Sequence, residues 1–281
     1  MPLLNMKEYH DKETKDLFDE VRKIKEEKGK NPKLVIITDG EDERCKTYMK
    51  SKLVHGENVG IEVIVKTIKN TMELEELLAE CFFESIPTIM QLPIKKELED
   101  WYNDNDYAQI LDVDGFFSYQ ALVNKNWDNA PCTAKGVMNY ILDSNGLDLD
   151  CRNKHLVVVG RGNLSGYPLS IMGIQEFGTV TTLTSKTTKI VKRNALATAD
   201  VVVLATGVKG SVKMSELPKD RNIYVINVGT MFDENGKLTT ELDVDCEREN
   251  VWYTDRIRAV GVSTCSSLME NVVNFYKNNL E

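Results

Sequence analysis

Three polar side chains in the first half of the chain have types and spacing that could do chemistry. Tyr48 and Lys52 are four residues apart in a segment with helical periodicity, so both side chains project from one face. Gln91 ends an apolar run directly before Leu92-Pro93, where parallel sheets present functional groups. Each feature also has a structural interpretation: a helix surface with a partly buried tyrosine for the first pair, and a satisfied edge amide for Gln91.

Two aspartates follow in the stretch "LDVDGF". Asp112 and Asp114 offer carboxylates that could accept hydrogen bonds from a ligand. An aspartate before a glycine is also ordinary turn chemistry, so the pair by itself leaves both interpretations open.

A glycine-rich turn lies in the second half, in "KHLVVVGRGNLSGYPLSIMG". Gly160, Gly162 and Gly166 are spaced G-x-G-x-x-x-G, one residue longer than the usual dinucleotide fingerprint. The pattern predicts a strand ending at Gly160 and a helix opening near Tyr167-Pro168, whose amino-terminal N–H groups could hold a pyrophosphate. The alternative is a plain strand-to-helix turn that needs glycine for its backbone angles.

The end of the next strand indicates which dinucleotide would bind. NAD-binding folds usually place an acid there, but this strand ends in Ser185-Lys186 without one. A hydroxyl, a lysine and the nearby Arg161 suit a 2′-phosphate, so the sequence favours NADP over NAD.

Composition excludes several classes of protein. The 281 residues carry a net charge of −9 without a long basic run, which argues against a nucleic-acid partner. The longest apolar runs are far shorter than the ~20 residues of a membrane span, and the charged amino-terminal segment lacks the apolar core of a signal peptide. The six cysteines form no Cys-x-x-Cys pair, so neither a disulfide framework nor a metal site is expected, and the cytoplasm is the default compartment.

Strand and helix signals alternate along most of the chain. Helical periodicity in residues 43–60 and 72–82 alternates with apolar runs at residues 31–39, 61–68 and 87–94. A second series begins at residue 134, and the last helix is expected over residues 263–280. Only residues 102–133 lack clear periodicity. This alternation predicts two α/β domains with mostly parallel sheets, flanking a cleft, of which the second is Rossmann-like.

Taken together, the motifs resemble one known family. The stretches "TYMKSK", "IMQLPI", "DVDGF", "PCTAKG", "VVVGRGNLSGYPL", "TLTSKT" and "ADVVVLATG" are similar in order and spacing to the methylenetetrahydrofolate dehydrogenase/cyclohydrolase family, from about residue 32 to 274. In that family the long glycine spacing is the phosphate turn. The resemblance implies a folate-binding catalytic domain of residues 1–132 plus 262–281, an NADP-binding domain of residues 133–261, and a homodimer.

The resemblance also implies roles for the catalytic candidates. Lys52 would be the base and acid, Tyr48 would stack on or orient the folate ring, Gln91 would bond Lys52, and Asp114 would hold the pterin nitrogens. A lysine among neutral or desolvating neighbours can lose its proton and work as a base, which agrees with this assignment.

Seven further residues match the family's cofactor contacts. Thr133 and Thr264 would lie near the nicotinamide. The others are Gly160, Arg161, Gly162, Ser185 and Thr230.

The chain departs from the family pattern at several positions. The proline- and glycine-rich loop before the last helix is replaced by "TDRIRAVGVST", residues 254–264. Ala134 replaces a proline, Leu111 a lysine, Gly162 a serine and Gln120 an asparagine. These changes leave three alternatives beside the bifunctional enzyme: a dehydrogenase alone, a non-catalytic NADP(H)-binding module, or an unrelated dehydrogenase that shares the nucleotide unit.

Overall fold

The computed structural model describes residues 2–232, 238–254 and 261–278. The chain divides into two compact α/β units. The first, called the three-stranded unit, comprises Lys12–Gln120, Asp128–Ala130 and the chain from Cys265 onward. The second, called the five-stranded unit, comprises Met1–Asp11, Ala121–Trp127 and Pro131–Thr264. The prediction of two α/β units with parallel sheets is confirmed.

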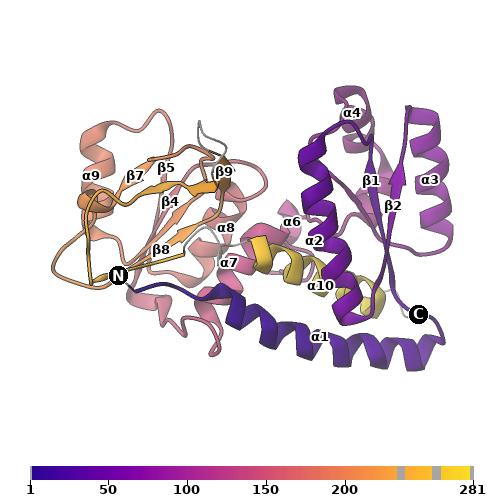
Figure 1. The fold of residues 1–281 in the computed structure, drawn as a ribbon, viewed down its shortest axis with the longest axis horizontal. Coiled ribbons are helices and arrows are strands. Elements are labelled where there is room, and N and C mark those ends of the chain that lie inside the picture. Colours follow the sequence, from indigo (N-terminus) through magenta and orange to yellow (C-terminus); the bar gives the residue numbers. More distant parts are fainter. Residues whose placement is uncertain (1, 233–237, 255–260, 279–281) are drawn as a thin grey trace. The chain divides into compact units, whose positions relative to one another are not determined.

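The three-stranded unit has a parallel sheet of order β2-β1-β3. The strands are β1 (Lys33–Thr38), β2 (Glu62–Thr67) and β3 (Thr88–Met90). Helices α2 (Glu43–Val59) and α3 (Thr71–Phe83) lie on either side of the β1–β2 pair (Figure 1). Helices α4 (Lys96–Asn103) and α5 (Asp106–Leu111) complete this part of the fold.

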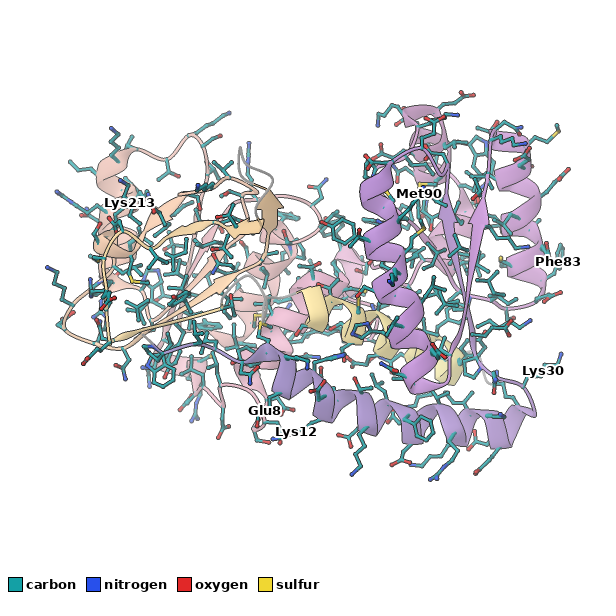
Figure 2. All side chains as sticks on the ribbon, in the orientation of Figure 1. Glu8, Lys12, Lys30, Phe83, Met90 and Lys213 are labelled. Atoms are coloured by element: carbon teal, nitrogen blue, oxygen red, sulfur yellow. The ribbon has the colours of Figure 1, made fainter. Side chains whose placement is uncertain are left out.

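Burial in this unit follows the sequence pattern closely. β1 is almost wholly apolar, "KLVIIT", and five of its six residues are buried, as expected for a central parallel strand. Its side chains pack with Leu74 and Leu78 of α3, which are both fully buried. Figure 2 shows the contrast at the unit's surface: Met90 points inward and is 2% exposed, while Phe83 points away and is 80% exposed.

The five-stranded unit has a parallel sheet of order β12-β8-β6-β4-β5. Its strands are β4 (His155–Val159), β5 (Thr179–Leu183), β6 (Val201–Leu204), β8 (Ile223–Asn227) and β12 (Val251–Tyr253). The associated helices are α7 (Cys132–Leu142), α8 (Gly166–Glu176) and α9 (Lys189–Thr198). The middle strand β6 is a continuous run of valine and leucine, "VVVL", with all four residues buried, as expected for a parallel strand that is covered on both faces.

Smaller elements complete the five-stranded unit. β7 (Val212–Lys213) pairs in parallel with β11 (Leu242–Asp243), and β9 (Thr230–Phe232) pairs with β10 (Leu238–Thr240). Short 3₁₀ turns cover Cys151–Asn153 and Met214–Glu216. At the sheet edge, Leu3 bridges to Tyr253 of β12, and the Leu4 N–H donates to the Tyr253 carbonyl at 2.9 Å.

The chain passes from one unit to the other at five points. Three of them lie in the helices α1 (Met6–Lys28), α6 (Tyr119–Val123) and α10 (Gly261–Asn278), and the other two follow Trp127 and Ala130. Residues 102–133, expected to be irregular, in fact contain α5 and α6. These helices have six and five residues, too few for an apolar period to emerge from the sequence. No described helix is long and apolar enough to cross a membrane.

Candidate active site

Lys52 and Gln91 form a buried polar pair in the three-stranded unit. Lys52 projects from α2, Gln91 follows the last residue of β3, and the two side chains are 8% and 7% exposed. The Lys52 Nζ donates to the Gln91 Oε1 at 2.9 Å. The Gln91 Nε2 in turn donates to the Leu92 carbonyl at 2.8 Å, which fixes the orientation of the amide. The carboxyl end of a parallel strand therefore presents an acceptor to a lysine that is largely removed from water.

Tyr48 lies one turn before Lys52 on α2, and its side chain is 53% exposed. Because about half of this side chain is open to solvent, a flat ligand could stack on its ring. Ser51, the residue before Lys52, places its Oγ 3.4 Å from the Cys265 Sγ of α10. Burial raises the pKa of the Cys265 thiol, while the nearby Lys52 charge lowers it and that of Asp114 raises it. The structure thus brings both charged groups near one thiol.

Asp114 is half-buried and is held by the turn that Asp112 organises. The Asp114 N–H donates to the Asp112 Oδ1 at 3.0 Å, and the Asp112 carbonyl accepts from the Asn129 side chain at 2.6 Å. Burial raises the pKa of Asp112 to about 7, and the charge of Asp114 adds to the effect. The Asp112 Oδ2 is buried without a hydrogen-bond partner. Of the two aspartates, the inner one is therefore the turn former, and Asp114 keeps its carboxylate for other contacts.

The glycine turn connects β4 to α8 in the five-stranded unit. Gly160 has a φ of +116°, and a Cβ there would lie 2.2 Å from the Ala205 carbonyl oxygen, so no other residue fits. A Cβ on Gly166 would similarly lie 2.4 Å from the Gly160 oxygen. A Cβ on Gly162 would meet nothing within 4 Å. The first and third glycines are thus required by the fold, whereas Gly162 faces open space where a ligand could approach the backbone.

A cavity of about 440 Å³ lies beside this turn, at the carboxyl ends of β4, β5 and β6. Arg161 and Lys192 contribute positive charge to its lining. None of its described lining residues carries a carboxylate. They are Val159, Gly160, Arg161, Gly162, Leu183, Thr184, Ser185, Thr187, Lys192, Ala205, Thr206, Val208 and Ser211.

This cavity fits a phosphorylated dinucleotide. The start of α8 adds to the fit, because its N-cap residue Ser165 makes no side-chain capping bond and leaves the helix end for another acceptor. Lys192, on α9, is a lining residue that the sequence did not indicate. Its ammonium forms an ion pair with Glu216, whose two carboxylate oxygens lie 3.0 and 2.9 Å away.

The remaining predicted cofactor residues lie outside this lining. The Thr264 Oγ1 of α10 donates to the Thr133 Oγ1 of α7 at 3.3 Å, so the two hydroxyls are neighbours. The backbone of Thr230 begins β9, and its side chain lies outside the described part of the structure. Residues 255–260 of the replaced loop also lie outside the described residues.

Metal and disulfide chemistry have no support in the described part of the chain. The six cysteines are free, and no group of three or more His, Cys, Asp or Glu side chains among the described residues could hold a metal ion.

Comparison with known proteins gives two separate matches to family profiles. Residues 4–103 match "Tetrahydrofolate dehydrogenase/cyclohydrolase, catalytic domain", and residues 131–280 match "Tetrahydrofolate dehydrogenase/cyclohydrolase, NAD(P)-binding domain". This chain belongs to the tetrahydrofolate dehydrogenase/cyclohydrolase family. The resemblance inferred from the motifs is confirmed.

Curated relatives place the chain within the same family along nearly its whole length. The chain is 33% identical over 266 residues to "Bifunctional protein FolD" of Geobacillus thermodenitrificans, covering 92% of this chain and 91% of the relative. It is 32% identical over 274 residues to the protein of the same name from Bacillus cereus, covering 95% and 93%.

Solved structures of the family share the fold. The bifunctional enzyme FolD of Campylobacter jejuni has a TM-score of 0.87 at 26% identity, with 99% of each chain covered. The Trypanosoma brucei enzyme, solved with NADP and an inhibitor, has a TM-score of 0.87 at 23% identity, with full coverage of both chains. The NAD-dependent dehydrogenase of Saccharomyces cerevisiae has a TM-score of 0.73 at 17% identity, covering 99% and 97%. The last two structures are described with different cofactors, NADP and NAD respectively.

Proposed function

We propose that this protein is a bifunctional one-carbon folate enzyme. It oxidises 5,10-methylenetetrahydrofolate to the 5,10-methenyl form with reduction of NADP, and then adds water to the methenyl bridge to give 10-formyltetrahydrofolate and a proton. The observation that carries the proposal is the buried hydrogen bond of 2.9 Å between Lys52 and Gln91, at the position where the family resemblance expects the proton-transferring group.

Lys52 moves the proton in this proposal. Its Nζ is held by the Gln91 Oε1, and Gln91 is itself held by the backbone, so the amine has a fixed direction before substrate binds. Such preorganisation is what proton transfer requires. The exposed ring of Tyr48 stacks on or orients the folate, and the half-buried carboxylate of Asp114 accepts hydrogen bonds from the pterin nitrogens. The folate-binding part is assigned to residues 1–132 plus 262–281.

The five-stranded unit, with residues 133–261 as the nucleotide-binding part, holds NADP. When bound, NADP accepts the hydride at its nicotinamide ring. The glycine turn and the start of α8 hold the pyrophosphate, and Arg161, Ser185 and Lys192 bind the 2′-phosphate. The absence of a carboxylate among the described lining residues supports NADP, since NAD-binding sites usually present an acid to the ribose hydroxyls.

The decisive experiment separates the two activities. The purified protein is assayed with methylenetetrahydrofolate and either NADP or NAD, and separately with methenyltetrahydrofolate without cofactor. We expect NADP-dependent oxidation and cofactor-independent hydrolysis. Lys52→Met should abolish hydrolysis, because general acid–base groups contribute ~10²–10⁴-fold. The same variant should retain some dehydrogenase activity, because hydride transfer depends chiefly on geometry.

Other outcomes of this assay would identify the alternatives. Oxidation without hydrolysis would indicate a dehydrogenase alone, which the replaced residues 254–264 would explain. NADPH binding without any turnover would indicate a binding module, and full hydrolysis by the Lys52→Met variant would remove Lys52 from the mechanism.

The family resemblance supports two further proposals. The protein is expected to form a homodimer, which light scattering coupled to size exclusion tests directly. It is also expected to act in the cytoplasm in purine biosynthesis, and a tagged protein located by microscopy in its own cell tests the compartment.

A further inference from the structure

Glu241 is a buried carboxylate that the proposed mechanism does not use. It directly precedes β11, and its side chain is 0% exposed. Carboxylates are almost never fully buried unless they are paired or hydrogen-bonded. The donors that Glu241 accepts from are neutral groups of a single loop, so the carboxylate acts on that loop.

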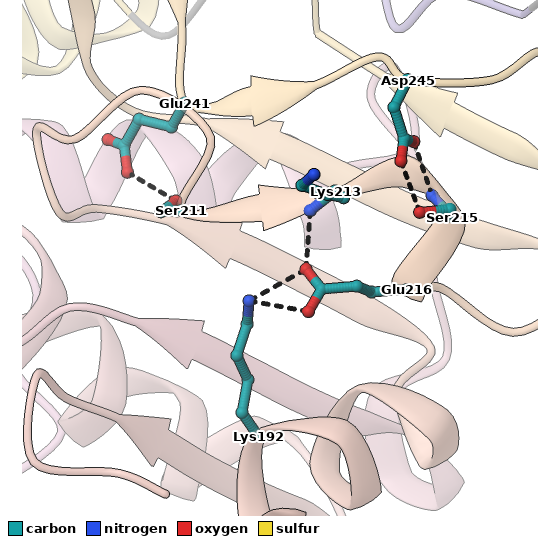
Figure 3. A network of polar contacts seen from close by, with 7 residues as sticks. All are labelled: Lys192, Ser211, Lys213, Ser215, Glu216, Glu241 and Asp245. Atoms are coloured by element: carbon teal, nitrogen blue, oxygen red, sulfur yellow. Dashed lines mark hydrogen bonds and ion pairs between the residues drawn. The ribbon is translucent and has the colours of Figure 1, made fainter. Parts of the chain in front are cut away.

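The loop lies between β6 and β7, at residues 205–211. The Glu241 Oε2 accepts from the Thr206 N–H at 2.8 Å and from the Thr206 Oγ1 at 2.6 Å. The Oε1 accepts from the Gly207 N–H at 3.1 Å, and the Ser211 Oγ lies 3.5 Å from Oε2 (Figure 3). One side chain therefore binds the loop near both of its ends.

The same loop forms one wall of the cavity beside the glycine turn. Thr206, Val208 and Ser211 all line it. The Thr206 Oγ1, while donating to Glu241, accepts from the Val208 N–H at 3.0 Å, and Gly207 has a φ of +66°. The backbone path that places Val208 against the cavity is thus fixed by the hydroxyl that Glu241 binds.

The chain around Glu241 also has a fixed conformation. The next residue, Leu242, donates its N–H to the Asn227 Oδ1 at 2.9 Å, and the Asn227 Nδ2 donates to the Thr254 carbonyl at 2.7 Å. Gly229 leaves room for the carboxylate, because a Cβ there would lie 2.8 Å from the Glu241 Oε1. The carboxylate therefore has a fixed position, and its hydrogen bonds hold the loop in place.

We propose that Glu241 is a positioning residue for the dinucleotide, which it serves by holding the 205–211 loop as a preformed wall of the cavity. The inference rests on the proposed function only in the identity of the dinucleotide. Without the carboxylate, two backbone N–H groups and two hydroxyls lose their acceptor, and the wall no longer has a single conformation. The cofactor would then have to order the loop on binding, which lowers affinity.

The test compares cofactor binding with a reaction that needs no cofactor. In Glu241→Gln an amide nitrogen replaces one acceptor and faces the loop donors. We expect the Kd of NADPH, measured by fluorescence titration, to rise by roughly tenfold to a hundredfold, the loss of one or two hydrogen bonds to a charged group. Hydrolysis of methenyltetrahydrofolate should stay at the wild-type rate. Asp245→Asn is the matched control, since Asp245 accepts from the Ser215 N–H and Oγ outside the cavity lining (Figure 3).

A second variant moves the same carboxylate by a substitution at the neighbouring Gly229. Gly229→Ala displaces the Glu241 carboxylate without substituting Glu241 or any loop residue, and it should raise the Kd of NADPH in the same way. A Kd within twofold of wild type in a folded Glu241→Gln protein would overturn the proposal. So would a parallel fall of both activities and of the Tm, which would mark a purely structural role. Because NADPH binding is measured directly, the result stands even where the wild-type protein shows no turnover and the proposed function fails.

Discussion

The Gln91 side chain offers the sharpest test of how the lysine is prepared for proton transfer. Its Oε1 accepts from the Lys52 Nζ at 2.9 Å, and both side chains are more than nine-tenths buried. Removing one partner of a buried hydrogen bond costs about 1–3 kcal/mol. If that bond is stronger in the transition state than in the free enzyme, Gln91→Ala should lower kcat/KM for hydrolysis by about five- to 150-fold.

A double-mutant cycle shows whether the loss acts through Lys52. Lys52→Met already removes the donor, so adding Gln91→Ala to it should cost almost nothing further. The assay is the steady-state hydrolysis of methenyltetrahydrofolate by the wild type, both single variants and the double variant. Ser51→Ala is the control, because it changes the neighbouring residue and its 3.4 Å contact with Cys265 but leaves the Lys52–Gln91 bond in place. Additive losses in the double variant would refute the reasoning, as would a Gln91→Ala enzyme of full activity.

Three further predictions concern the cofactor and the buried aspartate. Ser185→Asp adds a negative charge beside the proposed 2′-phosphate and should weaken NADP binding selectively by about 1–3 kcal/mol; equal losses for NAD and NADP in parallel titrations would sink the assignment. Glu216→Gln releases Lys192 from a half-exposed ion pair and should tighten NADP by about two- to fivefold, with no change for NAD and no effect when Lys192→Gln is also present. Asp112→Asn tests the buried carboxyl: because burial raises its pKa from 3.8 to about 7, the folded protein keeps a proton that the unfolded chain loses between these values. Wild-type stability should therefore fall relative to Asp112→Asn as the pH rises from about 4 to 7, by up to about 4 kcal/mol, and stay constant above that. Denaturant unfolding of both proteins at several pH values checks this slope, and parallel stability curves would contradict it.

Features that depend on local sequence were predictable. The four-residue spacing of Tyr48 and Lys52 places both on α2, and the apolar run before Gln91 forms β3. Gly160 directly follows β4, one residue beyond the strand's last residue, and the steric demand of its positive φ could be read from that single residue.

Features that depend on distant contacts were not predictable. Glu241 binds a loop more than thirty residues earlier in the chain, and no periodicity marks it. Lys192 lies on a helix face where a lysine is ordinary, and only the folded cavity distinguishes it. The three residues of β12 are too few for an alternation or an apolar run to be recognised.

The pairing of the first residues with β12 has a practical consequence for handling the protein. Strand edges with free N–H and C=O groups can pair with other chains and promote aggregation. Here Leu3 and Leu4 occupy part of the β12 edge, and Leu4 is only 3% exposed. Removing these residues, or fusing a bulky tag directly to them, would expose the β12 edge of the five-stranded sheet.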